Sequence, residues 1–598
     1  MNTPTPTKSP VSWGDFAFRW LSQGAGGFVL AVAASLVAVL VYQAWPALAR
    51  FGELKVLTSA DWSPDKGVYG ALLFVFGTVA TAVVAMAVAV PLGVGAATFL
   101  SEIAPPRVRK ISSFLLELLA AIPSVIFGFW ALEFLARRGL APVFSLFGSH
   151  NQSGEGILAA GLVLAVMILP YITALSFDVC QAVPRSQREG SLALGATRWR
   201  TIWSVVLPYA RPGIIAACVL ALGRAAGETM AVTMVVGGAR ELSAAPDALG
   251  DSIPSLIAKQ LNEAGPADVT RRAVLIALGL LLLAIAVGMN VGARVLVRWA
   301  SKPRARAGRA VAVPENPPPP DPAELAASRE QAARARVRED RTNRLMTGVL
   351  WACQLLTVVP LFLILGYITY RGAGYVTPEF FTNLPNEPGQ PPGLAHALVG
   401  SVTLVGLASV FAIPIGLLAA VFLSEYRNHP LVTPVRFVAE LLGNVPSIVI
   451  GVFAYALLVY PLWLAPGERG WGFSGWAGAF ALGVMMLPVV IRSAEEAMRL
   501  VPNSLREASY ALGAGRRQTV MKVVIPAALP AIITGVLLAV GRVAGETAPL
   551  ILTARGSNFF ARSLSDQTAS LPYYVYDFAL KPGAAQKNLA WAGAFVLV

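Results

Sequence analysis

The 598-residue chain is 56% hydrophobic and only 13% charged, with a mean hydropathy of +0.63 and a formal net charge of +14. Soluble globular proteins carry about 25% charged residues, so this composition excludes an ordinary soluble enzyme and predicts an all-α integral membrane protein surrounded by lipid. The basic residues stand in short loops and one linker between apolar runs, without interleaved aromatic residues, which argues against a nucleic-acid partner. The cysteines Cys180, Cys218 and Cys353 show neither a disulfide framework nor a metal-ligand spacing, so no metal site is expected.

Apolar runs divide the chain into two similar sets. A helix needs about 20 residues to cross a bilayer, and six runs of that order are followed by five more. They cover 27–46, 69–100, 112–135, 157–175, 213–237 and 273–297, then 346–369, 395–423, 436–463, 474–491 and 530–553. A twelfth run begins near residue 589 and stops at Val598. Ten residues are too short to span at 1.5 Å per residue, so we expect the last helix to be incomplete in this sequence.

A linker separates the two sets. It contains ENPPPPDP, which is too rich in proline for a continuous helix, and then an Arg/Glu/Ala-rich stretch. That stretch is either a flexible tether, which we favour, or a short solvated helix. We therefore predict a first six-helix half at 1–298, a linker at 299–345 and a second six-helix half at 346–598. The basic loops and the linker fall on one side if six helices precede the linker, and this side should be cytoplasmic together with the N-terminus.

The two halves repeat each other in the same direction. Residues 89–102 (AVPLGVGAATFLSE) parallel 412–425 (AIPIGLLAAVFLSE), whereas EGSLALGATRWRTIWSVVLP at 189–208 parallels EASYALGAGRRQTVMKVVIP at 507–526. The first pair stands at an offset of 323 residues and the second at 318. Helix order and basic loops run in the same sense, so we interpret the chain as a parallel duplication rather than an inverted one.

The repeated polar loop is the first candidate functional element. Its glycines allow a sharp bend or a close approach, its prolines suit the first turn of the following helix, and Leu192, Leu194, Leu512 and Val520 offer apolar contacts. The pattern resembles the "EAA" signature of the permeases of binding-protein-dependent ABC importers. The resemblance implies that each loop docks in a cleft of one ATP-binding subunit, so two copies of an ATPase are expected. The matched docking residues are Glu189, Gly195, Arg198, Pro208, Glu507, Gly513, Arg516 and Pro526. The alternative is an ordinary basic interfacial loop.

Charges inside the fifth apolar run of each half form the second candidate element. GRAAGETMAV at 223–232 aligns with GRVAGETAPL at 541–550. Charged residues inside a membrane are costly and usually face a bundle interior or a polar path. One interpretation is a structural ion pair, because Arg and Glu four apart share a helix face. The other is a pore-lining oxyanion site, since guanidinium groups match phosphate geometry. The residues concerned are Arg224, Glu228, Thr229, Arg542, Glu546 and Thr547.

These sequences, together with SDQTASLP at 565–572, resemble the two permease subunits of the high-affinity phosphate ABC importer, fused through the linker. The resemblance implies a type I importer fold in the inner membrane, a periplasmic binding protein that delivers inorganic phosphate, and ATP with magnesium bound only by the partner ATPase. No GxxxxGK[ST] sequence occurs, so no cofactor and no ATP hydrolysis are expected on this chain, and no catalytic residue is assigned. The alternatives are another oxyanion such as molybdate or sulfate, an ion-gradient-driven transporter, or a membrane scaffold.

Overall fold

The computed structural model describes residues 13–51, 59–238, 242, 243, 245, 247–264, 268–300, 322–385, 390–461 and 470–598. These residues are almost entirely helical, apart from one small antiparallel hairpin of β1 (Trp62–Ser63) and β2 (Val68–Tyr69). Nine helices are long and apolar enough to cross a membrane, and the described residues contain up to eleven spans if two bent helix pairs are counted. The predicted all-α membrane class is therefore confirmed.

The first half contains α1 (Trp13–Phe51), η1 (Pro64–Lys66), α3 (Leu72–Glu102), α4 (Pro106–Ala121), α5 (Ser124–Trp130), η2 (Ala131–Leu140), α6 (Ala141–Leu146), α7 (Ile157–Gln181), α8 (Arg185–Ala193), α9 (Arg198–Thr201), η3 (Ile202–Val206), α10 (Leu207–Ala226), α11 (Met230–Val235), α12 (Ile253–Gln260) and α13 (Val269–Ala300).

The second half contains α14 (Pro322–Gly372), η4 (Ala373–Tyr375), α15 (Pro378–Thr382), α16 (Ala395–Glu425), α17 (Val432–Leu442), α18 (Ser447–Ala454), η5 (Tyr455–Val459), α19 (Gly475–Arg499), α20 (Asn503–Ala511), α21 (Arg516–Thr519), η6 (Val520–Val524), α22 (Ile525–Ala544), α23 (Ala548–Thr553), α24 (Leu571–Leu580) and α25 (Ala584–Leu597).

The third apolar run of each half is not one straight span. In the first half the helix turns by 89° between α4 and α5, and in the second it turns by 102° between α17 and α18. Each bend ends at a proline, Pro123 or Pro446, which directly precedes the outgoing helix. Proline lacks an amide donor and disfavours helical geometry in the residue before it. Hydropathy alone predicted one continuous span at each place, and that expectation is wrong.

The linker ends in a long helix. Helix α14 begins at Pro322 and runs for 51 residues without interruption, so the expected boundary at residue 346 lies inside it. The Arg/Glu/Ala-rich stretch is thus helical rather than a flexible tether. The proline-rich part of the linker, 301–321, lies outside the described residues. At the other end of the half, α25 has 14 residues and begins five residues before the apolar run recognised in the sequence.

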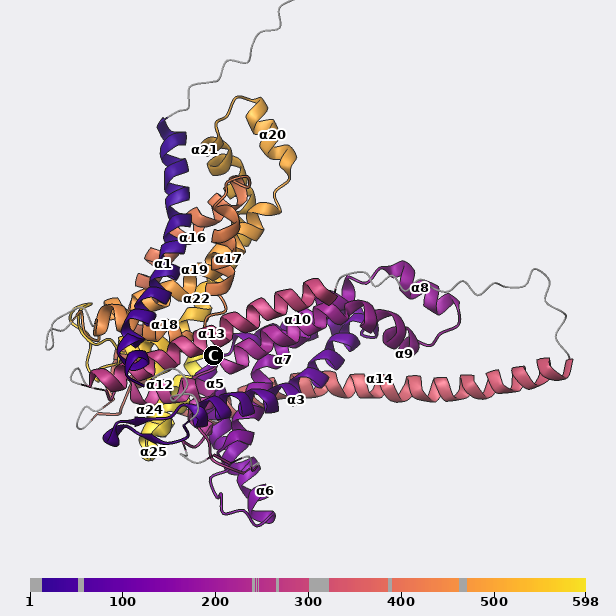
Figure 1. Cartoon of the computed structure of the whole chain (residues 1–598), viewed down its shortest axis with the longest axis horizontal. Coiled ribbons are helices and arrows are strands. Elements are labelled where there is room, and N and C mark those ends of the chain that lie inside the picture. Colours follow the sequence, from indigo (N-terminus) through magenta and orange to yellow (C-terminus); the bar gives the residue numbers. More distant parts are fainter. Residues whose placement is uncertain are drawn as a thin grey trace, which may run out of the picture.

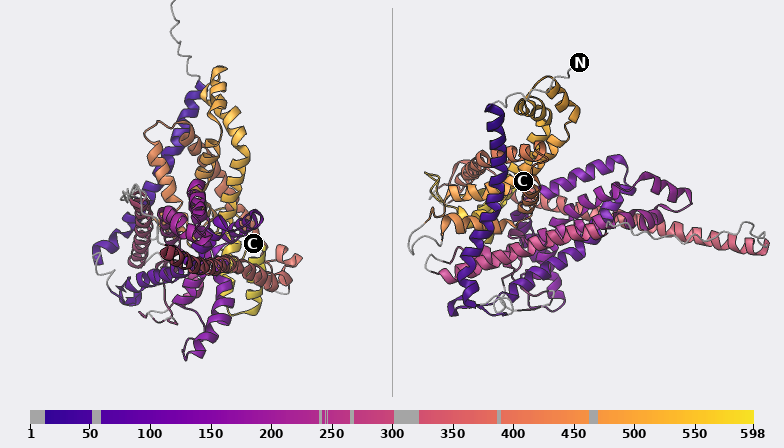
Figure 2. Two further views of the ribbon diagram at one scale, coloured as in Figure 1. Left: turned by 90° about the vertical axis from the view of Figure 1, so that its right-hand side faces the viewer. Right: turned by 45° about the horizontal axis from the view of Figure 1, so that its top comes forward.

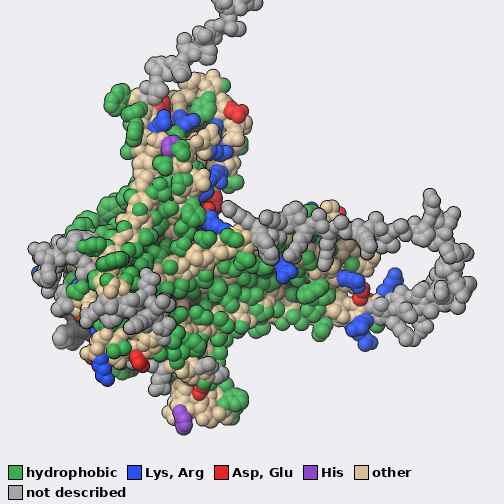
Figure 3. Space-filling view, viewed as in Figure 1, with side chains coloured by type: hydrophobic (Ala, Val, Ile, Leu, Met, Phe, Trp, Pro, Cys, Tyr) green, Lys and Arg blue, Asp and Glu red, His purple; other side chains and the backbone are tan. Residues whose placement is uncertain are grey.

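The first helix of each half packs on the other half. Helix α1 lies against α16 and α17, and α14 lies along α3, α4 and α9. Figures 1 and 2 show the result as two diverging arms, with α1 beside α20 and α21 in one arm and α14 beside α8 and α9 in the other. Hydrophobic side chains cover the middle of the molecule in Figure 3, whereas Lys and Arg side chains gather toward the ends of the arms.

One buried apolar core runs through both halves. For example, Phe129 of α5 stacks on Trp591 of α25 with ring centroids 3.8 Å apart. Ser252–Pro254 and Ser570–Pro572, matched outer segments, are buried at the starts of α12 and α24. The amides of Ile253 and Leu571 donate to the hydroxyls of Thr78 and Ser401, at 3.0 and 2.8 Å. These segments therefore pack inside the fold.

Candidate transport site and docking loops

The fifth span of each half is interrupted at its charged motif. Helix α10 ends at Ala226 and α11 begins at Met230, so residues 227–229 form a first break; α22 and α23 leave a second break at 545–547. Glu228 and Glu546 stand inside the breaks, whereas Arg224 and Arg542 stand in the last turn of the preceding helices. The premise that each Arg–Glu pair shares one helix face is therefore wrong.

The four charges are neighbours across the two halves. Glu546 interacts electrostatically with Arg542 of its own half and with Glu228 and Arg224 of the other. Among the described residues no ion pair joins Arg224 to Glu228, and the Nε of Arg224 has no hydrogen-bond partner. Instead, the Arg224 guanidinium lies 4.1 Å from the ring centroid of Tyr171. The described residues of the first half therefore show no Arg–Glu ion pair that would lock the helix.

Glycine and proline join the two halves at these breaks. A Cβ on Gly227 would lie 2.8 Å from Cγ of Pro446, and a Cβ on Gly545 would lie 2.7 Å from Cγ of Pro123. Both distances are below van der Waals contact, so only glycine fits at either position. Each fifth-span break therefore packs against the third-span bend of the opposite half, and four interruptions meet at one crossing.

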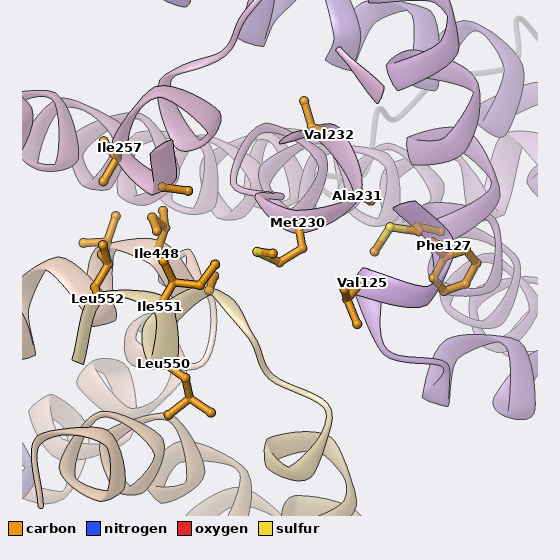
Figure 4. Packing of buried hydrophobic residues seen from close by; sticks show 14 of the residues in the cluster. Val125, Phe127, Met230, Ala231, Val232, Ile257, Ile448, Leu550, Ile551 and Leu552 are labelled. Atoms are coloured by element: carbon orange, nitrogen blue, oxygen red, sulfur yellow. The ribbon is translucent and has the colours of Figure 1, made fainter. Parts of the chain in front are cut away.

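An apolar layer lies beyond the crossing. Met230, Leu550 and Ile551 follow the breaks and are at most 4% exposed, and Val125 and Ile448 from the outgoing third-span helices are fully buried. Figure 4 shows these residues of the two halves packed in one cluster. Because α10 and α22 run from the polar loops toward the breaks, Arg224 and Arg542 lie on the loop side of this layer. The arrangement combines a charged site with an apolar seal on its far side.

Two threonines complete the matched set. Thr229 and Thr547 are 1% and 0% exposed, and neither hydroxyl has a hydrogen-bond partner among the described residues. Each stands directly before a short helix, α11 or α23. Unpaired buried hydroxyls are unusual because leaving one unsatisfied costs about 1–3 kcal/mol. All six residues predicted for the substrate path thus gather at the crossing.

The polar loops predicted to dock the ATPase form two matched exposed surfaces. We define the first docking loop as residues 185–201 and the second as 503–519; each is a short helix, α8 or α20, followed by a turn and the start of the fifth span. Gly195 and Gly513 have φ of +83° and +81°, a conformation that favours glycine. Leu194 and Leu512 lie at the bend, directly before these glycines, and are 91% and 89% exposed. These leucines present an apolar tip on each loop.

The other residues predicted to dock the ATPase differ in exposure. Glu189, Arg198, Glu507 and Arg516 are exposed on the loops, as are Pro208 and Pro526 in the first turns of α10 and α22. Those prolines do not begin the spans, which already start at Arg198 and Arg516; they follow the π-helical segments η3 and η6. Proline cannot donate the helical hydrogen bond, and the π-helical segments η3 and η6 accommodate this missing bond within each span. Val520 is fully buried and offers no docking contact.

Comparison with known proteins identifies the family. The family described as "binding-protein-dependent transport system inner membrane component" matches the chain twice, over residues 89–302 and 412–598. The chain belongs to this family. It is therefore a multi-pass inner-membrane transport subunit, and its parallel duplication is confirmed.

Relatives of two kinds resemble this permease. It is 37% identical over 305 residues to the phosphate transport system permease protein PstC of Pasteurella multocida, which covers 49% of this chain and 94% of that protein. It is 39% identical over 256 residues to the phosphate transport system permease protein PstA of Haemophilus influenzae, covering 43% of this chain and 88% of that protein. PstA of Yersinia pestis is 38% identical over 259 residues. Each alignment covers most of the relative's length but less than half of this chain.

Each half of the permease also contains an Arg–Glu contact, here called the clamp. The sequence did not show which arginine meets which glutamate. Arg188 of the first docking loop forms two hydrogen bonds of 2.9 and 3.1 Å with Glu102 at the end of α3. Its remaining donors reach the carbonyls of Val183 and Cys180 at the end of α7, both at 2.6 Å. Arginine thereby satisfies free carbonyls at a helix C-terminus and ties the docking helix to two spans.

The second half repeats the clamp. Arg506 donates to Glu425 at the end of α16, at 3.1 Å, and to the carbonyls of Val501 and Met498, at 2.6 and 2.8 Å. The signal was present in the sequence, because both arginines and both glutamates are repeated. The two offsets differ by five residues, so only the fold shows that each glutamate meets the arginine of its own half.

Proposed function

We propose that this chain is the membrane-spanning permease component of an ATP-driven importer of inorganic phosphate. A substrate-binding protein would deliver phosphate from the outside, and two copies of a separate ATPase would supply energy, one beneath each docking loop. The N-terminus and the linker would then be cytoplasmic, because α1 and α14 begin beside the docking loops. The observation that carries the proposal is the meeting of two Arg–Glu–Thr motifs at one crossing, in a chain similar to PstC and PstA phosphate permeases.

The chemistry of the crossing suits an oxyanion in passage. Two guanidinium groups attract a tetrahedral oxyanion and can donate paired hydrogen bonds to it. Two buried threonine hydroxyls could donate further bonds. The glutamates keep the local charge near balance, which limits affinity, and a conducting site must release what it binds. The apolar layer beyond the crossing would hold the site closed on its outer side in this conformation.

The docking loops provide the connection to ATP hydrolysis. Each exposed leucine tip would enter a cleft of an ATPase subunit, while the Arg188 and Arg506 clamps would convey movement of that subunit to α3, α7 and their counterparts. The fifth span begins in the same loop and ends at the charged break. Movement at the loop would therefore reach the crossing through one continuous helix, Arg198–Ala226 or Arg516–Ala544.

The test is reconstitution in proteoliposomes with the cognate ATPase and binding protein. We expect vanadate-sensitive uptake of labelled phosphate that depends on all three components. Sulfate and molybdate serve as competing substrates in matched reactions. Uptake of one of these oxyanions without phosphate uptake would refute the substrate, and uptake driven by an ion gradient without the ATPase would refute the coupling.

A further inference from the structure

Each docking loop is capped by a side chain from the opposite half. In the second docking loop, the amide of Arg517 donates to Oδ1 of Asp15 in α1, at 2.9 Å. In the first, the amide of Trp199 donates to Oδ1 of Asn343 in α14, at 3.0 Å. Trp199 and Arg517 are equivalent in the repeat, and each is the second residue of a fifth-span helix. The same orphan amide is thus satisfied from the other half in both places.

Two glycines allow α1 and the second docking loop to approach closely at Asp15. A Cβ on Gly515 would lie 2.5 Å from Oδ2 of Asp15, and a Cβ on Gly14 would lie 3.0 Å from Cζ of Arg517. Gly515 is the N-cap residue and has no side chain of its own to offer. Its counterpart in the first loop, Thr197, accepts a bond of 3.4 Å from the amide of Arg200. Among the described residues, Asp15 is therefore the one side-chain cap of the second loop.

Apolar anchors lie beneath both caps. Phe18, one turn after Asp15, is buried in a cluster with Val520 and Val524, just after the second docking loop. Leu350 of α14 is buried with Ile202, just after the first. Ile202 and Val520 are equivalent in the repeat. Each crossing helix is therefore held to the start of the opposite fifth span by one polar and one apolar contact.

We propose that Asp15 and Asn343 are positioning residues that make each docking loop move as one body with the first helix of the opposite half. A movement imposed by an ATPase under one loop would then reach both halves, because α1 and α14 continue through the membrane beside the helices of the other half. This inference rests on the proposed coupling to an ATPase. It adds a connection between the halves that neither the loop nor the Arg–Glu clamp supplies.

The test compares variants of the full chain reconstituted with the ATPase and binding protein, and measures phosphate moved per ATP hydrolysed. Loss of a side-chain cap changes the population of the capped state about fivefold. We expect Asp15→Ala and Asn343→Ala to lower the transport ratio by about that factor, while Asp15→Asn, which keeps the acceptor, stays near wild type. Glu339→Gln is the matched control, since Glu339 touches the same loop through an exposed ion pair with Arg200.

A double variant separates coupling from loop stability. Asp15→Ala/Gly515→Thr gives the second loop the N-cap residue of the first loop but leaves it without its link to α1. We expect ATPase binding to recover while the transport ratio stays low. Recovery of the ratio, or an unchanged ratio in Asp15→Ala, would overturn the inference. If the wild-type chain itself moved no phosphate, the proposed function would fail instead.

A disulfide tests the movement directly, because it replaces the Asp15 cap with a covalent link between the same two elements. Asp15→Cys/Gly515→Cys, in a chain with Cys180, Cys218 and Cys353 replaced, would join α1 to the second docking loop. We expect the oxidised protein to keep its ATP-driven uptake, because the two elements travel together. Uptake that stops on oxidation and returns on reduction would show that they move apart, and would contradict the inference.

Discussion

The fifth-span breaks of the two halves have the same backbone arrangement, but the contacts of their arginine side chains differ. Arg224 lies over the ring of Tyr171 and is half-buried, whereas Arg542 is exposed and has no ring contact or ion pair among the described residues. The residue equivalent to Tyr171 in the repeat is Val489. Duplication has thus kept the geometry of the crossing while placing one guanidinium against an aromatic ring and leaving the other without such a contact. Both arginines lie on the loop side of the apolar layer, and Arg542 is the more exposed of the two.

The arms differ in a similar way near the docking loops. In the second half, buried Glu495 accepts a hydrogen bond of 2.8 Å from Arg436, which ties α17 to α19, and forms an ion pair with Arg499 at 2.8 Å. The first half has Phe177 at the position of Glu495, and the Arg109 guanidinium lies 5.9 Å from its ring centroid. The second arm therefore relies on ion pairs where the first relies on apolar packing.

The largest effect should come from breaking the clamps. Arg506→Met leaves Glu425 as an uncompensated buried charge, which costs about 3–5 kcal/mol of stability, and should abolish ATPase binding at the second loop. Arg188→Met should cost less, because its pair with Glu102 is more exposed, at 19% and 11% against 9% and 5%. Thermal unfolding and ATPase pull-down measure both. Equal losses would show that burial does not set the difference, and Arg506→Met/Glu425→Gln should recover part of the loss.

Removing the more exposed guanidinium should come next. Arg542→Ala should lower phosphate uptake about 100-fold through loss of a charge-assisted contact, and Arg224→Ala should lower it less. Initial uptake rates in proteoliposomes, with ATPase binding as the assembly control, provide the measurement. A larger loss from Arg224→Ala would show that exposure does not set the order of the two effects.

Forcing a side chain onto the loop glycines should affect both halves alike. Alanine at Gly195 or Gly513 must adopt a left-handed conformation that costs about 1–2 kcal/mol. Nothing lies within 4 Å of a Cβ at either site, so the cost is conformational only. Affinity for the ATPase should fall by a similar factor in Gly195→Ala and Gly513→Ala. A clear difference between them would show that the bound ATPase contacts one bend directly.

Exchanging the aromatic partner tests the asymmetry itself. Tyr171→Val releases Arg224 from a cation–π contact worth about 0.5–2 kcal/mol, so the phosphate dependence of uptake should shift a few-fold. Tyr171→Phe keeps the ring and serves as the control. If the two variants behave alike, the ring does not restrain Arg224.

The smallest effect should come from the exposed ion pair between Arg200 and Glu339, which has no counterpart among the described residues of the second arm. Pairs of this kind contribute about 0–1 kcal/mol and weaken with salt. Arg200→Ala should therefore change ATPase affinity by less than a few-fold, and only at low ionic strength. A large effect that persists in high salt would identify Arg200 as a direct ATPase contact.

The repeat made the duplicated permease and its docking loops predictable, because polar, glycine-marked segments stand out between apolar runs. The breaks were not predictable in the same way. Residues 112–135 and 213–237 are apolar enough to read as spans, and an Arg–Glu spacing of four residues fits a helix. The bend at Pro123 and the break at Glu228 become necessary only when each meets the opposite half. Contacts such as Gly227 with Pro446 join residues over 200 positions apart, which no local pattern encodes.

The crossing of α1 also constrains how the protein is made. Helix α1 leaves the ribosome first, yet α16, against which it packs, begins at Ala395. At about 5–20 residues per second, that partner arrives roughly 20–80 s later. During that interval the side of α1 destined for α16 must face lipid or a chaperone. A single continuous chain ensures that the awaited partner comes from the same ribosome, so correct pairing does not depend on the supply of a second subunit.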